Sequence, residues 1–340
     1  MSAVKADAAA PGRPHALLRG AIGLLLVPWA GVLLGLVAIS AGVSFVSPYF
    51  LTTSNILGTV AVYFSWICIA GFGEALVMIG GGLDLSVGSV MGLAGMVSAL
   101  ALASGLPLAL ALVLGLGTGA LCGAINGLVI TRIGLNPFIT TLATLSVFRG
   151  ITYGMVQGQA ITPPSNAAGN LFSALGTAAL GPVPVPVVFM VVIGALLVVL
   201  LNQTPLGRHI YALGGNESAT RLLGLKVNRL KMLLYMISGA LAGLGGILLT
   251  AKSGTALPDA AVGYELPVIA AVIIGGTSLS GGRGTIPGVL IGAALLGVIQ
   301  NGIVLAGLAG YWQQLITGLV IAIAAALDIA RQRLEVLRSA

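Results

Sequence analysis

Long apolar runs dominate this chain and leave it few ways to fold. A helix crosses the hydrocarbon core of a bilayer with roughly 17 to 25 apolar residues, and ten runs of about this kind follow one another along the sequence. They lie at about 21–42, 56–79, 86–104, 106–131, 138–157, 183–201, 232–251, 264–277, 285–306 and 311–328. The run at 264–277 is short and ends in glycine, so we expect it to be tilted, broken or only partly spanning. The fold class expected is all-α, a polytopic transmembrane helical bundle of about ten spans.

Charged residues are too scarce for a water-soluble protein of this size. Only 7% of the 340 residues are charged, whereas a soluble domain carries roughly 25%. The mean hydropathy is +1.10. Lipid must therefore be the solvent for most of the surface.

The basic residues predict the orientation of the bundle. Lys5, Arg13 and Arg19 precede the first span, which places the N-terminus in the cytoplasm. With ten spans, 13 of the 15 basic residues fall on the cytoplasmic side; Lys252 falls outside and Arg149 within a span. The expected parts are a cytoplasmic tail 1–20, a transmembrane domain 21–328 with a cytoplasmic loop at 202–231, and a cytoplasmic tail 329–340.

Two features of the chain have simpler interpretations than they first suggest. The basic start followed by an apolar stretch resembles a signal peptide, but the stretch is too long and more spans follow, so we expect an uncleaved anchor. The net charge of +7 does not indicate nucleic-acid binding, because the basic residues separate the apolar runs instead of forming one face.

Several polar residues lie in or beside the predicted spans. Asp84 follows Gly80–Gly82 and precedes Ser86 at the start of an apolar run. Two roles stay open for it: capping the next helix, or a direct part in a translocation path or its gate. Side-chain amides that line a polar path, or bind neighbouring helices together, are expected at Asn126, Asn301, Gln300, Gln313 and Gln314.

Two charged residues are also predicted within spans. Glu74 and Arg149 lie toward opposite membrane faces, so we do not expect them to form an ion pair. The simplest interpretation of Arg149 is a side chain that reaches to the interface.

Glycine recurs at helical spacing in three runs. Such stripes let neighbouring helix backbones approach closely, and they lie at Gly115, Gly119, Gly123 and Gly127; at Gly239 and Gly243; and at Gly284, Gly288 and Gly292. The segments 79–88 and 274–282 also echo each other, as glycine-rich breaks that each lead into a helix. Interrupted helices in repeated halves are typical of transporters; chance similarity is the alternative.

The two longest connections differ in character. The outer one, at about 158–182, contains Pro163, Pro164 and Pro182 and predicts an ordered, non-helical cap. The inner one predicts a turn, a short helix and a turn: Gly214 and Gly215 break the chain, Asn216 caps, and a helix from Glu217 ends at Gly224. Two helical turns are not stable alone in water, so either the bundle or a soluble partner must cover this helix.

No catalytic chemistry is evident in the sequence. It lacks the G-x-x-x-x-G-K-[ST] phosphate loop, its histidines are His15 and His209, and no nucleophile–base pair is apparent. Cys68 and Cys122 lie inside apolar runs without metal-ligand spacing. We therefore expect a protein that is not an enzyme and that binds neither a metal nor a cofactor.

At these positions the sequence resembles the ribose-type permeases of ABC importers, over about 45–328. The resemblance rests on five stretches in order: Ser47 to Phe50 with Asn55; Gly81 to Ser89; Phe138 to Leu142 with Arg149 and Gly150; Gly207 to Gly224; and Gly263 to Leu266 with Gly275 to Leu279, Gly281 and Gly282. Glu74 departs from the family's pattern, where a less acidic residue is expected.

The resemblance implies a bacterial cytoplasmic-membrane permease for a monosaccharide such as ribose, xylose or galactose. It implies three kinds of partner: an ABC ATPase subunit that binds ATP and Mg²⁺, a periplasmic or extracellular sugar-binding protein, and a second permease copy or homologue. The short inner helix would be the coupling helix that binds the ATPase. Its residues would be Gly214, Gly215, Asn216, Glu217, Ser218, Ala219, Thr220, Arg221, Leu222 and Gly224, with Arg208 nearby.

Other functions stay open at this point. An ABC permease for branched-chain amino acids or nucleosides would share the architecture, and an ion-coupled secondary transporter would need no coupling helix. The path or gate residues expected are Asp84, Ser86, Asn126 and Asn301.

Overall fold

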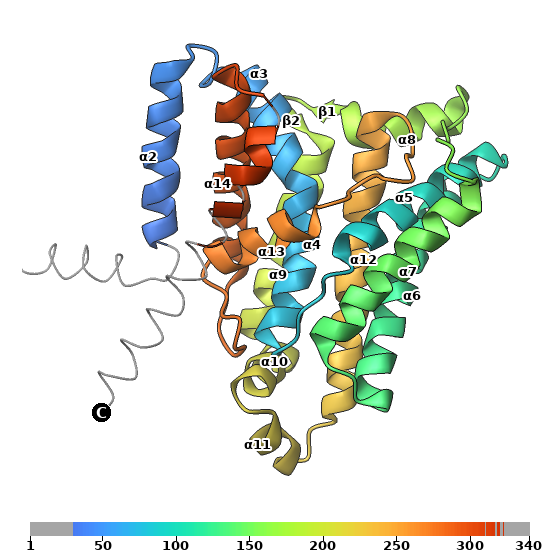
Figure 1. Cartoon of the computed structure of the whole chain (residues 1–340), viewed down its shortest axis with the longest axis vertical. Helices are drawn as coiled ribbons and strands as arrows, with labels where there is room; N and C mark the ends of the chain where they lie inside the picture. Colours follow the sequence, from blue (N-terminus) through green and yellow to red (C-terminus); the bar gives the residue numbers. More distant parts are fainter. Residues whose placement is uncertain (1–29, 310, 317, 320–321, 323–340) are drawn as a thin grey trace, which may run out of the picture.

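A bundle of helices running mostly along one long axis makes up the computed structural model (Figure 1). It describes residues 30–309, 311–316, 318–319 and 322. The helices of the bundle are α2 (Ala30–Val46), α3 (Thr53–Asn55), α4 (Val62–Ile79), α5 (Val87–Ala103), α6 (Leu108–Leu128), α7 (Pro137–Val156), α9 (Val185–Gln203), α12 (Val227–Ser253), α13 (Glu265–Ile274) and α14 (Ile286–Leu305). Two π-helical segments, η1 (Ile56–Ala61) and η2 (Val129–Ile133), continue α3 into α4 and extend α6.

The predicted spans correspond to helices wherever the structure describes them. Five are long and apolar enough to cross a membrane: Thr53–Ile79, Leu108–Ile133, Val185–Gln203, Val227–Ser253 and Ile286–Leu305. Helices α2, α5 and α13 are apolar but shorter, and α7 has the length of a span but contains Arg149 and four threonines. The polytopic helical fold is confirmed, whereas the count of ten spans stays a prediction. Both tails and half of 311–328 lie outside the described residues.

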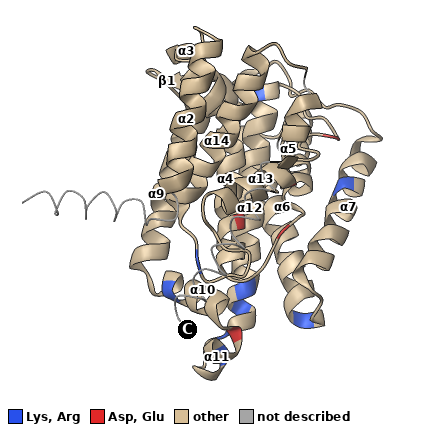
Figure 2. Cartoon of the chain, turned by 60° about the vertical axis from the view of Figure 1, so that its left-hand side comes forward, with Lys and Arg blue, Asp and Glu red and all other residues tan. Residues whose placement is uncertain are grey.

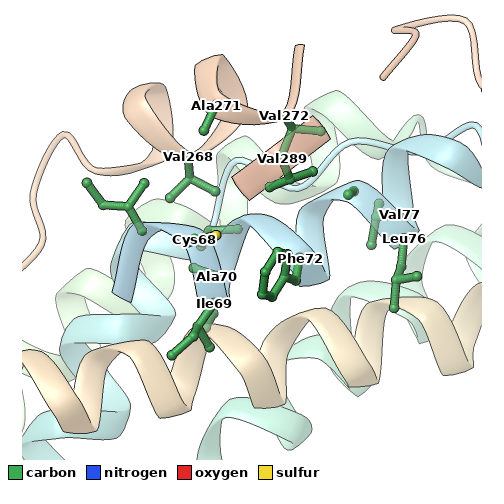
Figure 3. Close-up of a cluster of buried hydrophobic side chains, with 14 of the residues drawn as sticks. Cys68, Ile69, Ala70, Phe72, Leu76, Val77, Val268, Ala271, Val272 and Val289 are labelled. Carbon is green, nitrogen blue, oxygen red and sulfur yellow. The ribbon is translucent and has the colours of Figure 1, made fainter. Parts of the chain in front are cut away.

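Helix α4 lies at the centre of the bundle, with nearly every residue buried. Figure 3 shows Cys68 and Phe72 of α4 beside Val268 and Val272 of α13 and Val289 of α14, all five side chains buried. Because apolar side chains continue around the whole circumference of α4, it can pack against neighbours on every side.

The outer helices α2, α6, α7 and α9 expose apolar side chains. Leu121 of α6, Ile139 of α7 and Leu196 of α9 are each more than half exposed. Aliphatic faces of this kind suit contact with lipid acyl chains. The arrangement agrees with the scarcity of charge in the sequence.

Most of the glycines in the stripes lie where helices touch, as predicted for close packing, but Gly284 lies in the irregular segment before α14. Gly119 of α6 packs on the backbone of Gly239 in α12, Gly292 of α14 packs on Ala271 of α13, and Gly288 packs on Gly275 just after α13. A Cβ atom added to Gly127 would lie 2.9 Å from the Met232 Cα atom. Side chains at these positions would therefore push the helices apart.

The outer connection is partly helical, which corrects the prediction of a non-helical cap. It contains α8 (Ala167–Thr177) and a two-residue hairpin of β1 (Ala179–Leu180) with β2 (Val183–Pro184). The helix forms because the Asn166 side chain accepts a hydrogen bond from the Gly169 N–H at 2.9 Å, and because Phe172 is buried against the bundle. The prolines precede and follow this helix.

Helix α13 is the short run expected to be broken or partly spanning, and it is short in the structure too. Its ten residues rise about 15 Å, about half the thickness of a bilayer core. An irregular segment at 275–285 connects it to α14.

The opposite end of α12 from Lys252 carries α10 (Pro205–Gly215) and α11 (Glu217–Leu222). Basic residues gather there, as Figure 2 shows around α10, α11 and the start of α12. We call this the basic end.

Candidate functional site

Helices α10 and α11 form a hairpin at the basic end. α10 begins where the Thr204 hydroxyl accepts a hydrogen bond from the Gly207 N–H at 3.3 Å, and Pro205 suits the first helical turn. Ile210 and Leu213 bury the inner face of α10 against the bundle, while Arg208 stays exposed. A turn was predicted here, and the helical conformation of 205–215 corrects that prediction. The apolar spacing of Leu206, Ile210 and Leu213 is the sequence pattern that indicates this helix.

The short helix α11 begins at Asn216 as predicted. The Asn216 side chain accepts a hydrogen bond from the Ala219 N–H at 2.9 Å. The helix ends at Leu222, and Gly224 follows with a φ of +80°, a left-handed conformation that glycine adopts without strain.

Side-chain contacts bind α11 to both neighbouring helices. The Thr220 hydroxyl donates to the Ala212 carbonyl of α10 at 2.8 Å. The Glu217 carboxylate accepts from the Lys231 ammonium of α12 at 2.6 Å and from the Arg221 guanidinium at 3.1 Å. The hydrogen bond from Lys231 is the main reason why the pKa of Glu217 is lowered.

The outer end of α11 exposes two leucines. Leu222 is 90% exposed and Leu223 79% exposed, while Ser218 and Ala219 beside them are exposed too. Covering a leucine is worth about 1.5–3 kcal/mol. The bundle holds the helix in place without covering this surface.

Beneath the hairpin, four glycines from two loops and the end of helix α10 meet. Gly214 of α10 packs against the carbonyl of Ile79 and the backbone of Gly282. A Cβ atom added to Gly281 would lie 2.9 Å from the Cα atom of Gly81, and the Gly282 N–H donates to the Ile79 carbonyl at 2.8 Å. We call this contact the glycine junction.

The glycine junction joins the two segments whose sequences echo each other. The loop after α4 and the loop after α13 lie side by side there, and both touch the C-terminal turn of α10. A second link runs from the Tyr211 hydroxyl of α10, which donates to the Gly284 carbonyl at 2.8 Å. The sequence shows each glycine pair, but it does not show that the pairs contact one another.

A buried polar cluster holds the loop after α4. The Asp84 carboxylate accepts from the Ser86 N–H at 2.9 Å and from the Ser86 hydroxyl at 2.6 Å. The Asn126 amide of α6 donates to the Ser86 hydroxyl at 2.9 Å, and the Asp84 N–H donates to the Glu74 carboxylate at 3.0 Å. We call Glu74, Asp84, Ser86 and Asn126 the acid cluster.

The acid cluster brings together three of the four predicted path residues. Asp84, Ser86 and Asn126 are each at most 1% exposed. The Asp84 carboxylate accepts from the N–H of Ser86, the residue before α5, but no side chain caps the first turn of α5, so Asp84 anchors the loop without capping the helix. Glu74 Oε2 and Asn126 Oδ1 are buried without a hydrogen-bond partner within the described chain. Glu74 was noticed in the sequence only as an unusual charge; its contact with Asp84 could not be found there.

Asn301, the fourth predicted path residue, lies apart from the others. Its side-chain amide and that of Asn55 exchange two hydrogen bonds of 2.9 Å. This pair fixes α14 to α3, far along the bundle from the basic end (Figure 1). The contact is of the helix-binding kind that the sequence left open.

The Arg149 side chain is held by backbone carbonyls of two other segments. Its guanidinium donates to the carbonyls of Pro258 at 2.9 Å, Ala260 at 2.7 Å and Gly88 at 3.2 Å. It therefore fixes the 254–264 loop onto α5, and it does not pair with Glu74. Within the described residues no three His, Cys, Asp or Glu side chains come together as metal ligands.

Comparison with known proteins identifies the family of this architecture. The family model described as "Branched-chain amino acid transport system / permease component" matches residues 56–325. The ribose import permease protein RbsC of Bacillus subtilis is 43% identical over 88% of this chain and 92% of its own length. The D-allose transport system permease protein AlsC of Escherichia coli is 39% identical over 82% and 85%, and the L-arabinose permease protein AraH of the same species is 33% identical over 84% and 86%.

Proposed function

Because this chain belongs to the family of branched-chain amino acid transport system permease components, we propose that it is the membrane-spanning subunit of an ATP-driven importer for a monosaccharide. The curated relatives are named for ribose, allose and arabinose. Their names favour a sugar over the amino acid in the family's description. Reconstitution with a panel of sugars would identify the individual sugar.

The exposed leucines of α11 carry the proposal of an ATPase partner. Leu222 and Leu223 protrude from a helix that is capped by Asn216 and fixed to α10 and α12. A rigid helix with an uncovered apolar tip suits insertion into a groove of another protein. We assign α11 as the coupling helix, with Arg208 and Arg221 as exposed charges beside it.

The glycine junction offers the route from that helix into the bundle. α10 touches the loops after α4 and after α13 at once, so a shift of α10 would reach both halves of the core. ATP needs only to bind one state of the ATPase pair more tightly than the other to drive such a shift. Hydrolysis itself would take place on the partner, which would hold ATP and Mg²⁺.

The acid cluster supports the loop at the junction. Asp84, Ser86 and Asn126 fix the segment between α4 and α5, and we propose that they position a gate at the inner mouth of the path. Asn301 would stabilise the bundle and not contact the sugar, since its amide is already paired with Asn55.

The complete importer that we propose contains a second permease chain, two ATPase subunits and an extracellular sugar-binding protein. It would lie in the bacterial cytoplasmic membrane with the basic end and both chain termini inside. The gathering of basic residues at that end supports this orientation.

Reconstitution tests the function directly. The protein would be placed in proteoliposomes with the ATPase and binding protein encoded beside its gene, and uptake of labelled ribose, allose, arabinose, xylose, galactose and leucine would be measured. We expect uptake of one or more sugars that requires ATP and persists when ionophores dissipate the ion gradients. Uptake of leucine alone would favour the amino-acid alternative, and uptake driven by an ion gradient without ATP would indicate a secondary transporter.

A further inference from the structure

A second feature of the basic end is a cavity beside the coupling helix. Its volume is about 650 Å³. Its walls come from the end of η2, the last turn of α11, the loop after it and the first turns of α12. They consist of Thr131, Arg132, Arg221, Leu225, Lys226, Val227, Asn228, Arg229 and Met232.

The cavity is held open by the fold. The Asn228 side-chain amide donates to the Thr131 carbonyl at 3.2 Å, which joins α12 to η2 across the cavity. Val227 is buried at its base. The walls therefore keep their spacing without a ligand.

Four cationic side chains line this cavity and no acidic one does. Arg132, Lys226 and Arg229 form no ion pair or side-chain hydrogen bond with other described residues. Arg221 shares Glu217 with Lys231. Like charges gathered in one hollow repel one another unless an anion lies between them, and guanidinium groups hydrogen-bond phosphate oxygens in pairs.

An apolar surface begins next to the cations. Ile133 is 68% exposed directly after Arg132, and Phe138 and Ile139 at the start of α7 are 50% and 60% exposed. In a bilayer such side chains lie among acyl chains, and the cations lie at the level of the lipid headgroups. A phosphate with acyl chains attached satisfies both surfaces, whereas a soluble anion satisfies one.

We propose that this cavity binds the phosphate headgroup of an anionic glycerophospholipid from the same leaflet. Arg132 and Arg229 would hold the phosphate oxygens from opposite walls, with Lys226 adding charge. The acyl chains would lie along Ile133, Phe138 and Ile139. The bound lipid would bridge η2 and α12 beside the coupling helix.

Native mass spectrometry of the full-length protein in detergent provides the test, because it needs neither an ATPase nor a sugar. Phosphatidylglycerol and phosphatidylcholine with the same acyl chains would be titrated. We expect phosphatidylglycerol to bind more tightly, and the double variant Arg132→Gln, Arg229→Gln to lose about tenfold or more of that affinity, since each basic residue near an anionic surface contributes about 1 kcal/mol. The single variant Lys226→Gln should lose less affinity, and Lys252→Gln, at an exposed basic residue at the other end of α12, should bind phosphatidylglycerol as tightly as the unmodified protein.

Three outcomes would overturn the proposal. Equal affinity for the two lipids would remove the phosphate site, and inorganic phosphate that displaces the lipid at equal concentration would indicate a soluble anion. Unchanged phosphatidylglycerol affinity in the double variant, with ATPase binding lost, would assign the cavity to the ATPase interface. Thermal unfolding of each variant shows whether it is folded, and the Lys226→Gln titration gives the answer if the double variant is not.

Discussion

The outer face of α11 presents two leucine side chains to solvent, whereas the glycine junction one helix away is made of backbone with almost no side chains. Leu222 and Leu223 are 90% and 79% exposed; Gly214 and Gly281 are partly buried because backbones approach them closely. The leucine surface has apolar area left to bury against a partner, whereas the glycines have no side chain to bury. The difference distinguishes α11, on which a partner would act, from the glycine junction, which would transmit the resulting movement to the bundle.

Removing the apolar tip should have the largest effect, and only on assembly. The double variant Leu222→Ser, Leu223→Ser forfeits burial of two leucines at about 1.5–3 kcal/mol each, so ATPase affinity should fall by about a hundredfold or more. Stability of the permease alone should change by less than about 0.5 kcal/mol. Titration of the ATPase onto permease in nanodiscs measures the first quantity and thermal unfolding the second. Leu257→Ser, an exposed leucine at the other end, is the matched control; unchanged ATPase affinity in the double variant would contradict the assignment of α11.

A methyl group at the glycine junction should act mainly on the stability of the permease, in contrast to the leucine variant. Gly214→Ala places a Cβ atom against the Ile79 carbonyl and the Gly282 backbone, which should cost about 1–3 kcal/mol of stability by overpacking and reduce ATP-driven uptake. Gly215→Ala meets nothing within 4 Å and should be close to neutral. Unfolding midpoints in detergent compare the two variants. Equal midpoints would show that the junction yields more easily than its spacing suggests.

Variants of Asp84 test the buried acid cluster that holds the loop after α4. Asp84→Ala leaves the N–H and hydroxyl of Ser86 buried without their acceptor, at about 1–3 kcal/mol. Asp84→Asn retains an acceptor oxygen and should keep most of the stability. Uptake by the Asn variant decides between the two roles: retained uptake indicates a structural anchor of the loop, and lost uptake in a stable protein indicates a gate that needs the charge.

The smallest expected effect is a pH dependence at α11. Hydrogen bonding to Lys231 lowers the pKa of Glu217, so its stabilising contribution is full above the ordinary carboxyl pKa and is lost as the pH falls through the lowered value. The Glu217 side chain is 42% exposed, so solvent screening keeps the effect below about 1 kcal/mol. The protection factor of the α11 amides, which is the exchange rate relative to the intrinsic rate at each pH, should fall on acidification in the unmodified protein and stay constant in Glu217→Gln. A parallel fall in both proteins would exclude the ion pair as its cause.

The bundle could be predicted from the sequence because burial in lipid imposes a simple pattern. Apolar runs placed α4, α6, α9, α12 and α14, and the glycine stripes indicated close packing. The cap at Asn216 was also visible, because a helix start depends on neighbouring residues. These features are local, and local chemistry is what a single sequence displays.

What the sequence could not show depends on contacts between distant segments. Arg149 was expected at an interface, yet its partners are carbonyls more than 100 positions away at Pro258 and Ala260. The outer helix α8 was missed because flanking prolines suggested irregular structure, while burial of Phe172 stabilises a helix there. The separation of Asn301 from Asp84 likewise follows from the way the chain folds back.

A contact between backbones has a mechanical property that a contact between side chains lacks. Side chains absorb small displacements by rotating about their χ angles, whereas Gly81, Gly214 and Gly281 have no such torsions. Their φ and ψ angles are held by the helices and loops on either side. A displacement of α10 of a fraction of an ångström would therefore move the loops after α4 and α13 together, because no side-chain rotation at these contacts can absorb it.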